Sequence, residues 1–514
     1  MVSSKSFFVA CGLTLLPALV TSSPVVPRYF QRSLVTRGNI TTTTVEAELG
    51  PLLSSGSLIF GSESSDWANA TSRWNTLFQP DVQLVVEPAT ESDIAKIITY
   101  CNENSFEFLV RNRGHGTTAS LTTFSGIEIN VVQLQGVTIQ EDGETAIFQA
   151  GTYGAQVIQE LWDAGYVTTT GSTSCVGLMG PALGGGHSRY EGLYGMVMDG
   201  VVHFNVVLAN GTEIGVNETS HSDLLWGLKG AGHNFAVVTS AVKKIYPKDT
   251  DTWHYHTYVW TQDKLETVFE ALNTFHTSYN GTTPPKMGVN YGSIIMNTSV
   301  STTEAVLEWG FQYAGSADEA EALLAPFNAI DAVAETMGDV DYPTVSGVTS
   351  DDCASANYVI ASVMTLTYNV TTERALYNHF ISKVAQYPDL ATTAYLWHEG
   401  YATAGYQAIA SDSTAYPHRE ENHLMFFSTA VPDDSDLLDA AETWGKEAWD
   451  LWNAGQPDRQ PQTYVNYAEG HDYETLESIY GYDSWRLDTL RSLKAAYDPD
   501  NRFRYFVPII SDSS

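Results

Sequence analysis

The chain has 514 residues, enough for one large hydrophobic core or for two to three domains. Acidic residues outnumber basic ones 60 to 25, for a formal net charge of −35. This balance argues against nucleic acid or an anionic membrane as a partner, because both are recognised by basic patches. The composition is that of a globular protein, with no low-complexity tract and no internal repeat.

Residues 1–22 have the pattern of a secretory signal peptide. Lys5 provides a basic start, residues 7–20 are apolar, and small residues at 21–23 suit cleavage. The apolar run is too short for a membrane span, and no later segment is long and apolar enough. Seven Asn-x-Ser/Thr sequons support export, and they begin at Asn39, Asn69, Asn210, Asn217, Asn280, Asn297 and Asn369. We therefore expect a secreted, N-glycosylated protein.

The cysteines exclude a disulfide scaffold. Cys11 is lost with the leader, so Cys101, Cys175 and Cys353 allow one disulfide and leave one thiol over. Neither Cys-x-x-Cys nor His-x-x-x-His spacing occurs, so we predict no metal site.

The first half of the chain alternates strands, helices and glycine-rich turns. Residues 23–75 are rich in Ser and Thr, and we interpret them as an N-terminal arm that packs on the outside. Residues 82–86 predict a strand, and Thr90 with Asp93 predicts the N-cap of a helix that runs to about residue 101. Residues 106–110 predict a further strand, which completes a compact α/β unit.

A histidine between two glycines follows that strand. Gly114 and Gly116 bracket His115, and Arg111, Asn112 and Arg113 precede it. Glycines allow a backbone to approach a ligand closely, and arginines suit phosphate oxygens. A histidine in such a loop can serve as a base, a ligand or a covalent attachment point.

Two more glycine-rich segments follow. Strands are predicted over 127–132 and 145–150, and a helix over 156–164 ends at Gly165. Residues 171–186 are then too rich in glycine for a helix or an ordinary strand, and residues 223–235 form a similar turn before a β-rich run over 236–246. Backbone amides in such loops can face a large anion. No Walker motif is present, and a Rossmann fingerprint fits poorly.

The second half changes in character after residue 247. Strands predicted over 254–259 and 424–428 alternate with helices over 265–273 and 318–324. Residues 464–467 alternate like a strand, which would place Tyr464 and Asn466 on one face and Tyr467 on the other. Leu490, Leu493 and Tyr497 indicate a closing amphipathic helix.

Taken together, these motifs resemble the flavin-linked oxidases of the vanillyl-alcohol oxidase type, in particular the berberine-bridge-enzyme-like branch. The resemblance covers nearly everything after about residue 70. It is carried by the loop ending in Gly114-His115, by Val176-Gly177, Gly180 and Gly184-Gly185-Gly186 followed by Gly195 and Asp199, by residues 222–235, and by Asn466-Tyr467 and residues 498–503.

The resemblance implies an α+β fold with a two-subdomain FAD-binding domain of the PCMH type over residues 76–248. A substrate domain over 249–460, with an antiparallel sheet backed by helices, would follow it, and residues 461–514 would return to the FAD domain. It also implies FAD joined through its 8α-methyl group to His115. The other residues expected at the cofactor are Arg111, Asn112, Arg113, Gly114, Gly116, Thr173, Val176, Gly177, Gly180, Gly184, Gly185, Gly186, Asp199, Val237 and Asn466.

Three positions qualify that expectation. Arg113 stands where the family often has glycine. Thr173 stands where many members have a cysteine that forms a second flavin link, and Cys175 is two positions out of register. We therefore predict a single covalent link, with Cys175 as a buried small residue rather than an anchor. Val176 stands at the family's oxygen gatekeeper position, where valine goes with oxidases.

The resemblance implies an oxidase that takes a hydride from an alcohol or amine and reduces O₂ to hydrogen peroxide. The base is expected to be Tyr464 or, second, Tyr467. Candidate pocket residues in the substrate domain are Tyr395, Trp397, His398, Tyr416, His418 and Arg419. A small secondary-metabolite-like substrate and a monomer are expected. Two alternatives stay open: an oligosaccharide oxidase acting at the anomeric carbon, and a cyclase or binding protein that uses the scaffold without net redox chemistry.

Overall fold

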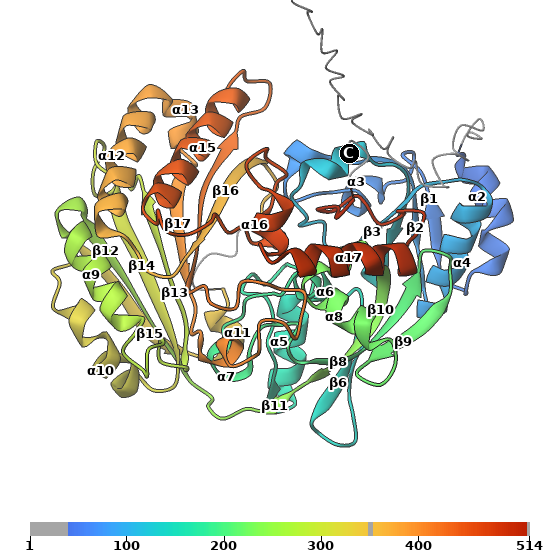
Figure 1. The fold of residues 1–514 in the computed structure, drawn as a ribbon, viewed down its shortest axis with the longest axis horizontal. Coiled ribbons are helices and arrows are strands. Elements are labelled where there is room, and N and C mark those ends of the chain that lie inside the picture. The colour runs from blue at the N-terminus through green and yellow to red at the C-terminus, as the bar shows by residue number, and fades with distance from the viewer. Residues whose placement is uncertain (1–39, 348–352, 511–514) are drawn as a thin grey trace, which may run out of the picture.

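The computed structural model describes residues 40–347 and 353–510. The predicted signal peptide, the first part of the expected N-terminal arm and the sequon at Asn39 lie outside the described residues. The predicted α+β class is confirmed: two smaller sheets lie on one side of the molecule and a seven-stranded sheet on the other (Figure 1). None of the described helices is long and apolar enough to cross a membrane.

The first sheet is the α/β unit expected around residues 82–110. Its strand order is β1-β2-β4-β3, with β2, β4 and β3 parallel and β1 antiparallel at the edge. The strands are β1 (Leu58–Phe60), β2 (Asp81–Glu87), β3 (Phe108–Arg111) and β4 (Ser125–Asn130). Helix α4 (Glu91–Glu103) begins with the predicted Thr90–Asp93 capping box and packs its isoleucines into this core. Because Ile59 pairs with Val86, part of the expected outer arm is an edge strand instead.

The second sheet is antiparallel and carries the glycine-rich loops. Its order is β5-β6-β10-β8-β9, with strands β5 (Val137–Ile139), β6 (Thr145–Gln149), β8 (Val201–Leu208), β9 (Glu213–Asn217) and β10 (Ala236–Lys244). Its core includes side chains from α5 (Gly154–Asp163), α6 (Met179–Leu183), α8 (Ser222–Ala231) and α17 (Ser484–Tyr497). Helix α17 comes from the chain's end, so the C-terminal segment returns to this half (Figure 1).

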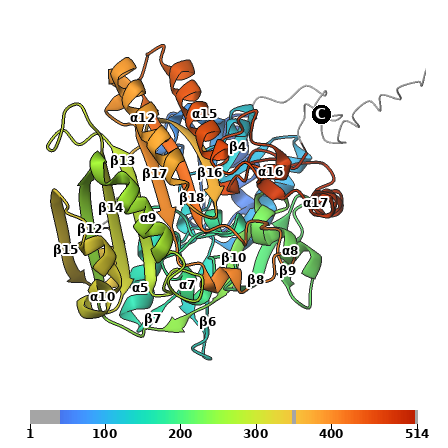
Figure 2. The same ribbon diagram turned by 60° about the vertical axis from the view of Figure 1, so that its left-hand side comes forward.

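The third sheet is antiparallel and has the order β15-β12-β14-β13-β17-β18-β16. Its strands are β12 (Trp253–Thr261), β13 (Met287–Ile295), β14 (Val306–Ala314), β15 (Ala334–Val340), β16 (Asn357–Thr365), β17 (Tyr395–Gly400) and β18 (His423–Val431). Helices cover one face (Figure 2): α9 (Leu265–Phe275), α10 (Ala317–Asn328), α12 (Val370–Gln386) and α15 (Leu438–Ala454). Even-numbered residues of β12 and β17, such as Trp260 and Leu396, enter the core under these helices.

Short elements connect the sheets. They are α2 (Thr42–Glu48), α3 (Trp67–Ala70), β7 (Tyr166–Val167), α7 (Glu191–Tyr194), β11 (Tyr246–Pro247), α11 (Tyr342–Val345), α13 (Pro388–Ala391), α14 (Ala404–Gln407) and α16 (Leu476–Tyr480). The prediction of a strand over residues 464–467 is wrong. Residues 465–467 form a short 3-10 turn, so Tyr464 and Tyr467 do not lie on opposite faces. The centres of their rings are 5.2 Å apart.

Candidate active site

A cavity of about 670 Å³ lies between the glycine-rich loops and the seven-stranded sheet. The loops contribute His115, Thr173, Val176, Gly177, Gly180 and Val237 to its wall. The sheet contributes Tyr291, Tyr395, Trp397, Glu399 and Phe426, and the C-terminal segment contributes Tyr464, Asn466 and Tyr467. All three regions that the sequence singled out therefore meet at one place.

Side chains of the His115 loop bind it to neighbouring segments. Arg111 donates to the carbonyl oxygen of Ser72 at 3.2 Å and lies 4.0 Å from the buried carboxylate of Glu128. Asn112 donates to the carbonyl oxygens of residues 150 and 152 at 2.8 and 3.0 Å. Gly114 has φ +72°, and a Cβ there would lie 2.6 Å from the Ser72 carbonyl oxygen, so the turn requires glycine. Arg111 and Asn112 thus shape the loop that presents His115.

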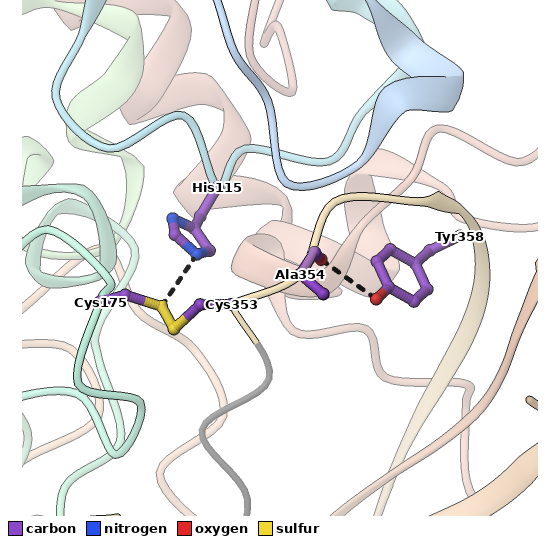
Figure 3. Close-up of a disulfide and its surroundings, with 5 residues drawn as sticks. All are labelled: His115, Cys175, Cys353, Ala354 and Tyr358. Carbon is purple, nitrogen blue, oxygen red and sulfur yellow. Dashed lines mark hydrogen bonds between the residues drawn. A yellow bond between two sulfur atoms is a disulfide. The ribbon is translucent and has the colours of Figure 1, made fainter. Parts of the chain in front are cut away.

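The His115 ring lies beside a disulfide that joins the two halves of the molecule. Cys175 in the glycine-rich loop bonds to Cys353, 178 residues further along the chain, and the His115 Nε2 lies 3.5 Å from the Cys175 Sγ (Figure 3). The expectation that Cys175 is simply a buried small residue is corrected: it is a cross-link. The thiol left over is Cys101, which lies on the buried face of α4.

Arg113 stacks its guanidinium on an aromatic ring and has one N–H group free to bind a ligand. Its guanidinium lies 3.8 Å from the ring centre of Tyr153, and burial lowers its pKa from the usual value. Its buried Nε has no hydrogen-bond partner among the described residues, and the side chain lines the cavity. A buried donor in that position is suited to an anionic oxygen of a bound ligand.

The glycine-rich loops pack too closely for side chains at several positions. A Cβ on Gly177 would lie 2.4 Å from the Asn112 Nδ2, and one on Gly184 would lie 2.2 Å from the Asn466 Oδ1. Gly185 and Gly186 have φ of +116° and +83°. Gly180, in contrast, lines the cavity with no atom within 4 Å of where its Cβ would be, so its backbone is open to a ligand.

The two tyrosines expected as bases differ in their partners. The Tyr464 hydroxyl accepts hydrogen bonds from the Gly186 N–H at 3.0 Å and from the Asn466 Nδ2 at 2.7 Å. The Tyr467 hydroxyl donates to the Glu399 Oε1 at 3.1 Å. Burial raises the pKa of both phenols above the usual value. Neither tyrosine is therefore ionised on its own near neutral pH, and only Tyr467 has a carboxylate beside it.

Glu399 is a site residue that the sequence reasoning missed. Besides Tyr467 it accepts hydrogen bonds from the Trp397 Nε1 and the Tyr401 hydroxyl, both at 3.1 Å, and burial raises the pKa of its carboxyl. It lies on β17 on the same face as Tyr395 and Trp397, both of which line the cavity. That alternation was a usable signal, because every second residue of a strand shares a face.

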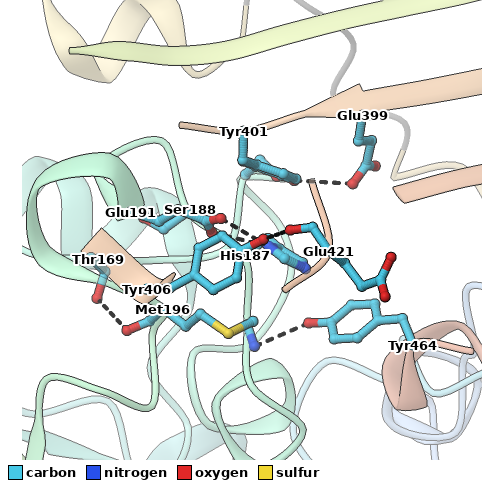
Figure 4. A network of polar contacts seen from close by, with 12 residues as sticks. Thr169, His187, Ser188, Glu191, Met196, Glu399, Tyr401, Tyr406, Glu421 and Tyr464 are labelled. Atoms are coloured by element: carbon cyan, nitrogen blue, oxygen red, sulfur yellow. Dashed lines mark hydrogen bonds and ion pairs between the residues drawn. The ribbon is translucent and has the colours of Figure 1, made fainter. Parts of the chain in front are cut away.

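His187 is the second missed residue. It follows the three glycines at 184–186, and its Nδ1 lies 3.1 Å from both carboxylate oxygens of Glu191 (Figure 4). Its ring stacks on Tyr401 at 4.7 Å and meets the Tyr464 ring edge-on at 5.1 Å. The Nε2 is buried without a hydrogen-bond partner among the described residues, and the side chain lines the cavity.

Several expected site residues lie away from the cavity wall. Asp199 is paired with Arg419, and the two oxygen–nitrogen contacts are both 2.7 Å. His418 contacts the carbonyl oxygens of Thr463 and Ile479, and burial lowers its pKa to about 4. Tyr416 is buried against Gly185. His398 points to the helix-covered face of β17 and pairs with Glu373 at 3.0 Å, because it alternates with Trp397.

The residues present fit an FAD. The cavity is within the usual size range for ligand sites. The open backbone at Gly180 and the Arg113 donor would face its phosphates, and His115 and Asn466 lie on the same wall. Gly184, Gly185 and Gly186 are not part of that wall, and Gly186 instead donates its N–H to the Tyr464 hydroxyl.

Comparisons with known proteins identify an FAD-binding domain. A family model described as an FAD binding domain matches residues 82–217. The FAD-linked oxidoreductase iacH of Pestalotiopsis fici is 75% identical over 514 residues and covers 100% of both chains. The FAD-linked oxidoreductase anuG of Penicillium roqueforti is 46% identical over 483 residues, which are 93% of this chain and 94% of that protein.

Solved structures have the same fold. BBE-like 1 of Physcomitrella patens superposes with a TM-score of 0.76 at 18% identity, over 92% of this chain and 99% of that one. A chitooligosaccharide oxidase superposes with a TM-score of 0.74 at 20% identity, over 90% and 98%. The chain therefore belongs to the FAD-linked oxidoreductases, with the fold of the berberine-bridge-enzyme-like branch of the vanillyl-alcohol oxidase type.

Proposed function

We propose that this FAD-linked oxidoreductase is a secreted oxidase that oxidises an alcohol or amine of a small aromatic, secondary-metabolite-like substrate. The observation that carries the proposal is the Tyr467–Glu399 pair on the cavity wall, between the His115 loop and the aromatic face of the seven-stranded sheet. FAD, when bound, would supply the two-electron oxidation and pass the electrons to O₂ to give hydrogen peroxide.

The chain's own residues would bind the substrate and remove one proton. Tyr395, Trp397 and Phe426 present aromatic rings to the cavity and suit a flat apolar substrate. The Tyr467 oxygen would accept the proton of the substrate hydroxyl or amine while its own proton passes to the Glu399 Oε1. Because burial raises the Glu399 pKa, its carboxylate is a better proton acceptor than an exposed one.

Tyr464 has a structural role in this proposal, in contrast to Tyr467. Its hydroxyl already accepts two hydrogen bonds, from Gly186 and Asn466, so it would hold the glycine loop and the C-terminal segment together. This reverses the expected order of the two tyrosines, in which Tyr464 came first. The reversal rests on the carboxylate that only Tyr467 contacts.

A single covalent flavin link at His115 is part of the proposal. A glucooligosaccharide oxidase of Acremonium strictum that shares this fold has a 6-S-cysteinyl, 8α-N1-histidyl FAD. Here Thr173 replaces the expected cysteine, and the Cys175 sulfur is already bonded to Cys353. Cys175 therefore has no thiol with which to form a second link.

The first experiment is acid precipitation of the secreted protein, followed by mass analysis of its peptides. A yellow pellet with FAD mass on the His115 peptide alone supports the proposed cofactor state. Yellow supernatant over a colourless pellet would contradict the covalent link, and absence of flavin would contradict the oxidase. A peroxide-coupled screen of aromatic alcohols and amines then tests the substrate class, with heat-denatured protein as the control for signal that does not need the folded enzyme.

An oligosaccharide oxidase is the second candidate, because several structural neighbours are oligosaccharide oxidases by name. Aromatic side chains on an exposed sheet face also stack on sugar rings. Including cellobiose, lactose and xylobiose in the same peroxide screen separates the two: turnover of these sugars without turnover of small aromatics would favour the second candidate.

Secretion and glycosylation are likewise proposed, with O₂ and a small molecule as the partners of a monomer. The sequon asparagines Asn69, Asn210, Asn280 and Asn369 are exposed and can accept a glycan. A mass decrease on treatment with peptide N-glycosidase, for protein recovered from culture medium, is the expected result. A single peak at the monomer mass in light scattering is the expected assembly state.

A further inference from the structure

A cluster of two histidines and three carboxylates lies on the far side of the seven-stranded sheet. His254 and His256 stand two apart on β12, so both rings point to the face that the helices cover; they are 3% and 1% exposed. Glu321 reaches them from α10. A single oxygen, the Glu321 Oε1, lies 2.8 Å from the His254 Nε2 and 2.8 Å from the His256 Nδ1. Three atoms that could bind one metal ion therefore lie close together.

The outer nitrogens of both rings face further carboxylates. The His254 Nδ1 lies 2.7 Å from the Asp339 Oδ1, and the His256 Nε2 lies 3.4 Å from the Glu335 Oε2. Both acids come from the edge strand β15, which pairs with β12. A histidine that binds a metal through one nitrogen commonly donates its other N–H to a carboxylate, which sets the ring's orientation. His254 has that arrangement with Asp339, and the His256 Nε2 lies near Glu335 without a hydrogen bond.

The contacts of the His254 ring suit a metal ligand. Its Nε2 faces the Glu321 Oε1 and its Nδ1 faces the Asp339 Oδ1. A divalent ion would lie between the two rings and Glu321. His254 can then bind the ion through its Nε2 and donate its Nδ1 proton to Asp339.

We propose that His254, His256 and Glu321 bind a divalent transition-metal ion, with Zn²⁺ as the best match to two imidazoles and one carboxylate. Of the residues that the structure describes, these are the only three His, Cys, Asp or Glu side chains that could hold an ion together. Tetrahedral zinc ligands stand about 3.3 Å apart, so the two 2.8 Å contacts need to open by about 0.5 Å. All three ligand atoms lie within 4.8 Å of one another. The Glu321 side chain is 29% exposed, which gives an ion access from solvent.

The metal would have a structural role that is separate from the proposed oxidase chemistry. β12 contributes no residue to the cavity wall, and the ligands lie on the opposite face of the sheet from Tyr395, Trp397 and Glu399. The ion would instead fix α10 and the edge strand β15 to β12. The ligands have His-x-His spacing on one strand. The sequence-based prediction of no metal site considered only the His-x-x-x-His and Cys-x-x-Cys spacings, so it missed them.

The test uses full-length holoprotein, stripped with a chelator and dialysed against Zn²⁺. We expect one zinc per chain by elemental analysis, and a rise of at least about 3 °C in the melting temperature at saturating zinc. His256→Gln and Glu321→Gln should each weaken zinc binding at least about 100-fold, and Asp339→Asn about 10- to 100-fold. His379→Gln is the matched control, because His379 pairs with Glu447 at 3.2 Å without a second histidine.

The outcomes are distinguishable from those of the proposed function, since flavin content is measured in the same samples and should not change. Retention of less than about 0.1 zinc per wild-type chain after dialysis, with no thermal shift, would overturn the proposal and leave an ordinary ion-pair network. Equal zinc retention by His379→Gln, His256→Gln and wild type would equally overturn it. If a variant fails to fold, wild-type stoichiometry and thermal shift still decide.

Discussion

Removal of the Asp199–Arg419 pair tests whether Asp199 holds the two halves of the molecule together or contacts the cofactor. The pair is bidentate, with both contacts at 2.7 Å, and the side chains are 3% and 2% exposed. Loss of one partner leaves the other charge buried and unpaired, which costs about 3–5 kcal/mol. Asp199→Asn and Arg419→Gln should therefore each lower the free energy of unfolding by about that amount.

The double variant gives the sharper measurement. With both charges removed no uncompensated ion remains, so its loss should be smaller than the sum of the single losses by at least about 1 kcal/mol. Asp450→Asn is the control, because Asp450 and Lys446 are 53% and 40% exposed and such helix pairs contribute about 0.3–0.5 kcal/mol.

Urea unfolding followed by tryptophan fluorescence gives the free energies, and peptide mass gives the flavin content of each folded variant. We expect Asp199→Asn to lose stability while keeping its flavin. An unchanged unfolding midpoint together with loss of flavin would refute this reasoning. It would restore Asp199 as a cofactor residue, the role expected from the family resemblance.

Three further predictions follow from the site. Tyr467→Phe and Glu399→Gln should each slow anaerobic flavin bleaching by about 10²- to 10⁴-fold. The double variant should be little slower than either single variant, because the two residues act as one unit. A larger loss of bleaching rate in Tyr464→Phe would contradict the assignment. Cys353→Ser should add one thiol to the titration count and leave FAD on the His115 peptide alone; FAD on the Cys175 peptide would contradict the register argument. Burial lowers the pKa of His418 to about 4, so the unfolded chain binds more protons below pH 6.5. His418 alone should therefore lower stability by up to about 3 kcal/mol as the pH falls from 6.5 to 4, and His418→Gln should reduce the slope of stability against pH in urea titrations.

Local patterns predicted the elements well. The capping residues at 90 and 93, the strand before His115 and the closing helix all appear close to the predicted bounds. These features depend on neighbours in sequence, which the sequence displays directly. The prediction for residues 464–467 failed because two tyrosines three residues apart fit a strand or a turn equally well. Contacts with Gly186 and Glu399 decide between the two.

Long-range contacts account for what the sequence did not reveal. Asp199 matches a family motif, yet its partner Arg419 is 220 residues away. Cys175 could be assigned to the disulfide only by knowing that Cys353 lies beside it. Glu399 needed both its place on β17 and the position of Tyr467. In each case the residue type indicated a role, and the fold supplied the partner that determined it.

The position of His115 illustrates how the two halves define one site. The loop that carries His115 is held on one side by the disulfide between Cys175 and Cys353. On the other side the Thr117 hydroxyl donates to the buried Glu469 carboxylate at 2.7 Å, and the Ile360 N–H of β16 donates to the same carboxylate at 2.8 Å. The disulfide and the Thr117–Glu469 contact each join the flavin-binding half to a segment more than 170 residues away in the sequence. Substitutions at Cys353 or Glu469 should therefore disturb the flavin environment without contacting the flavin.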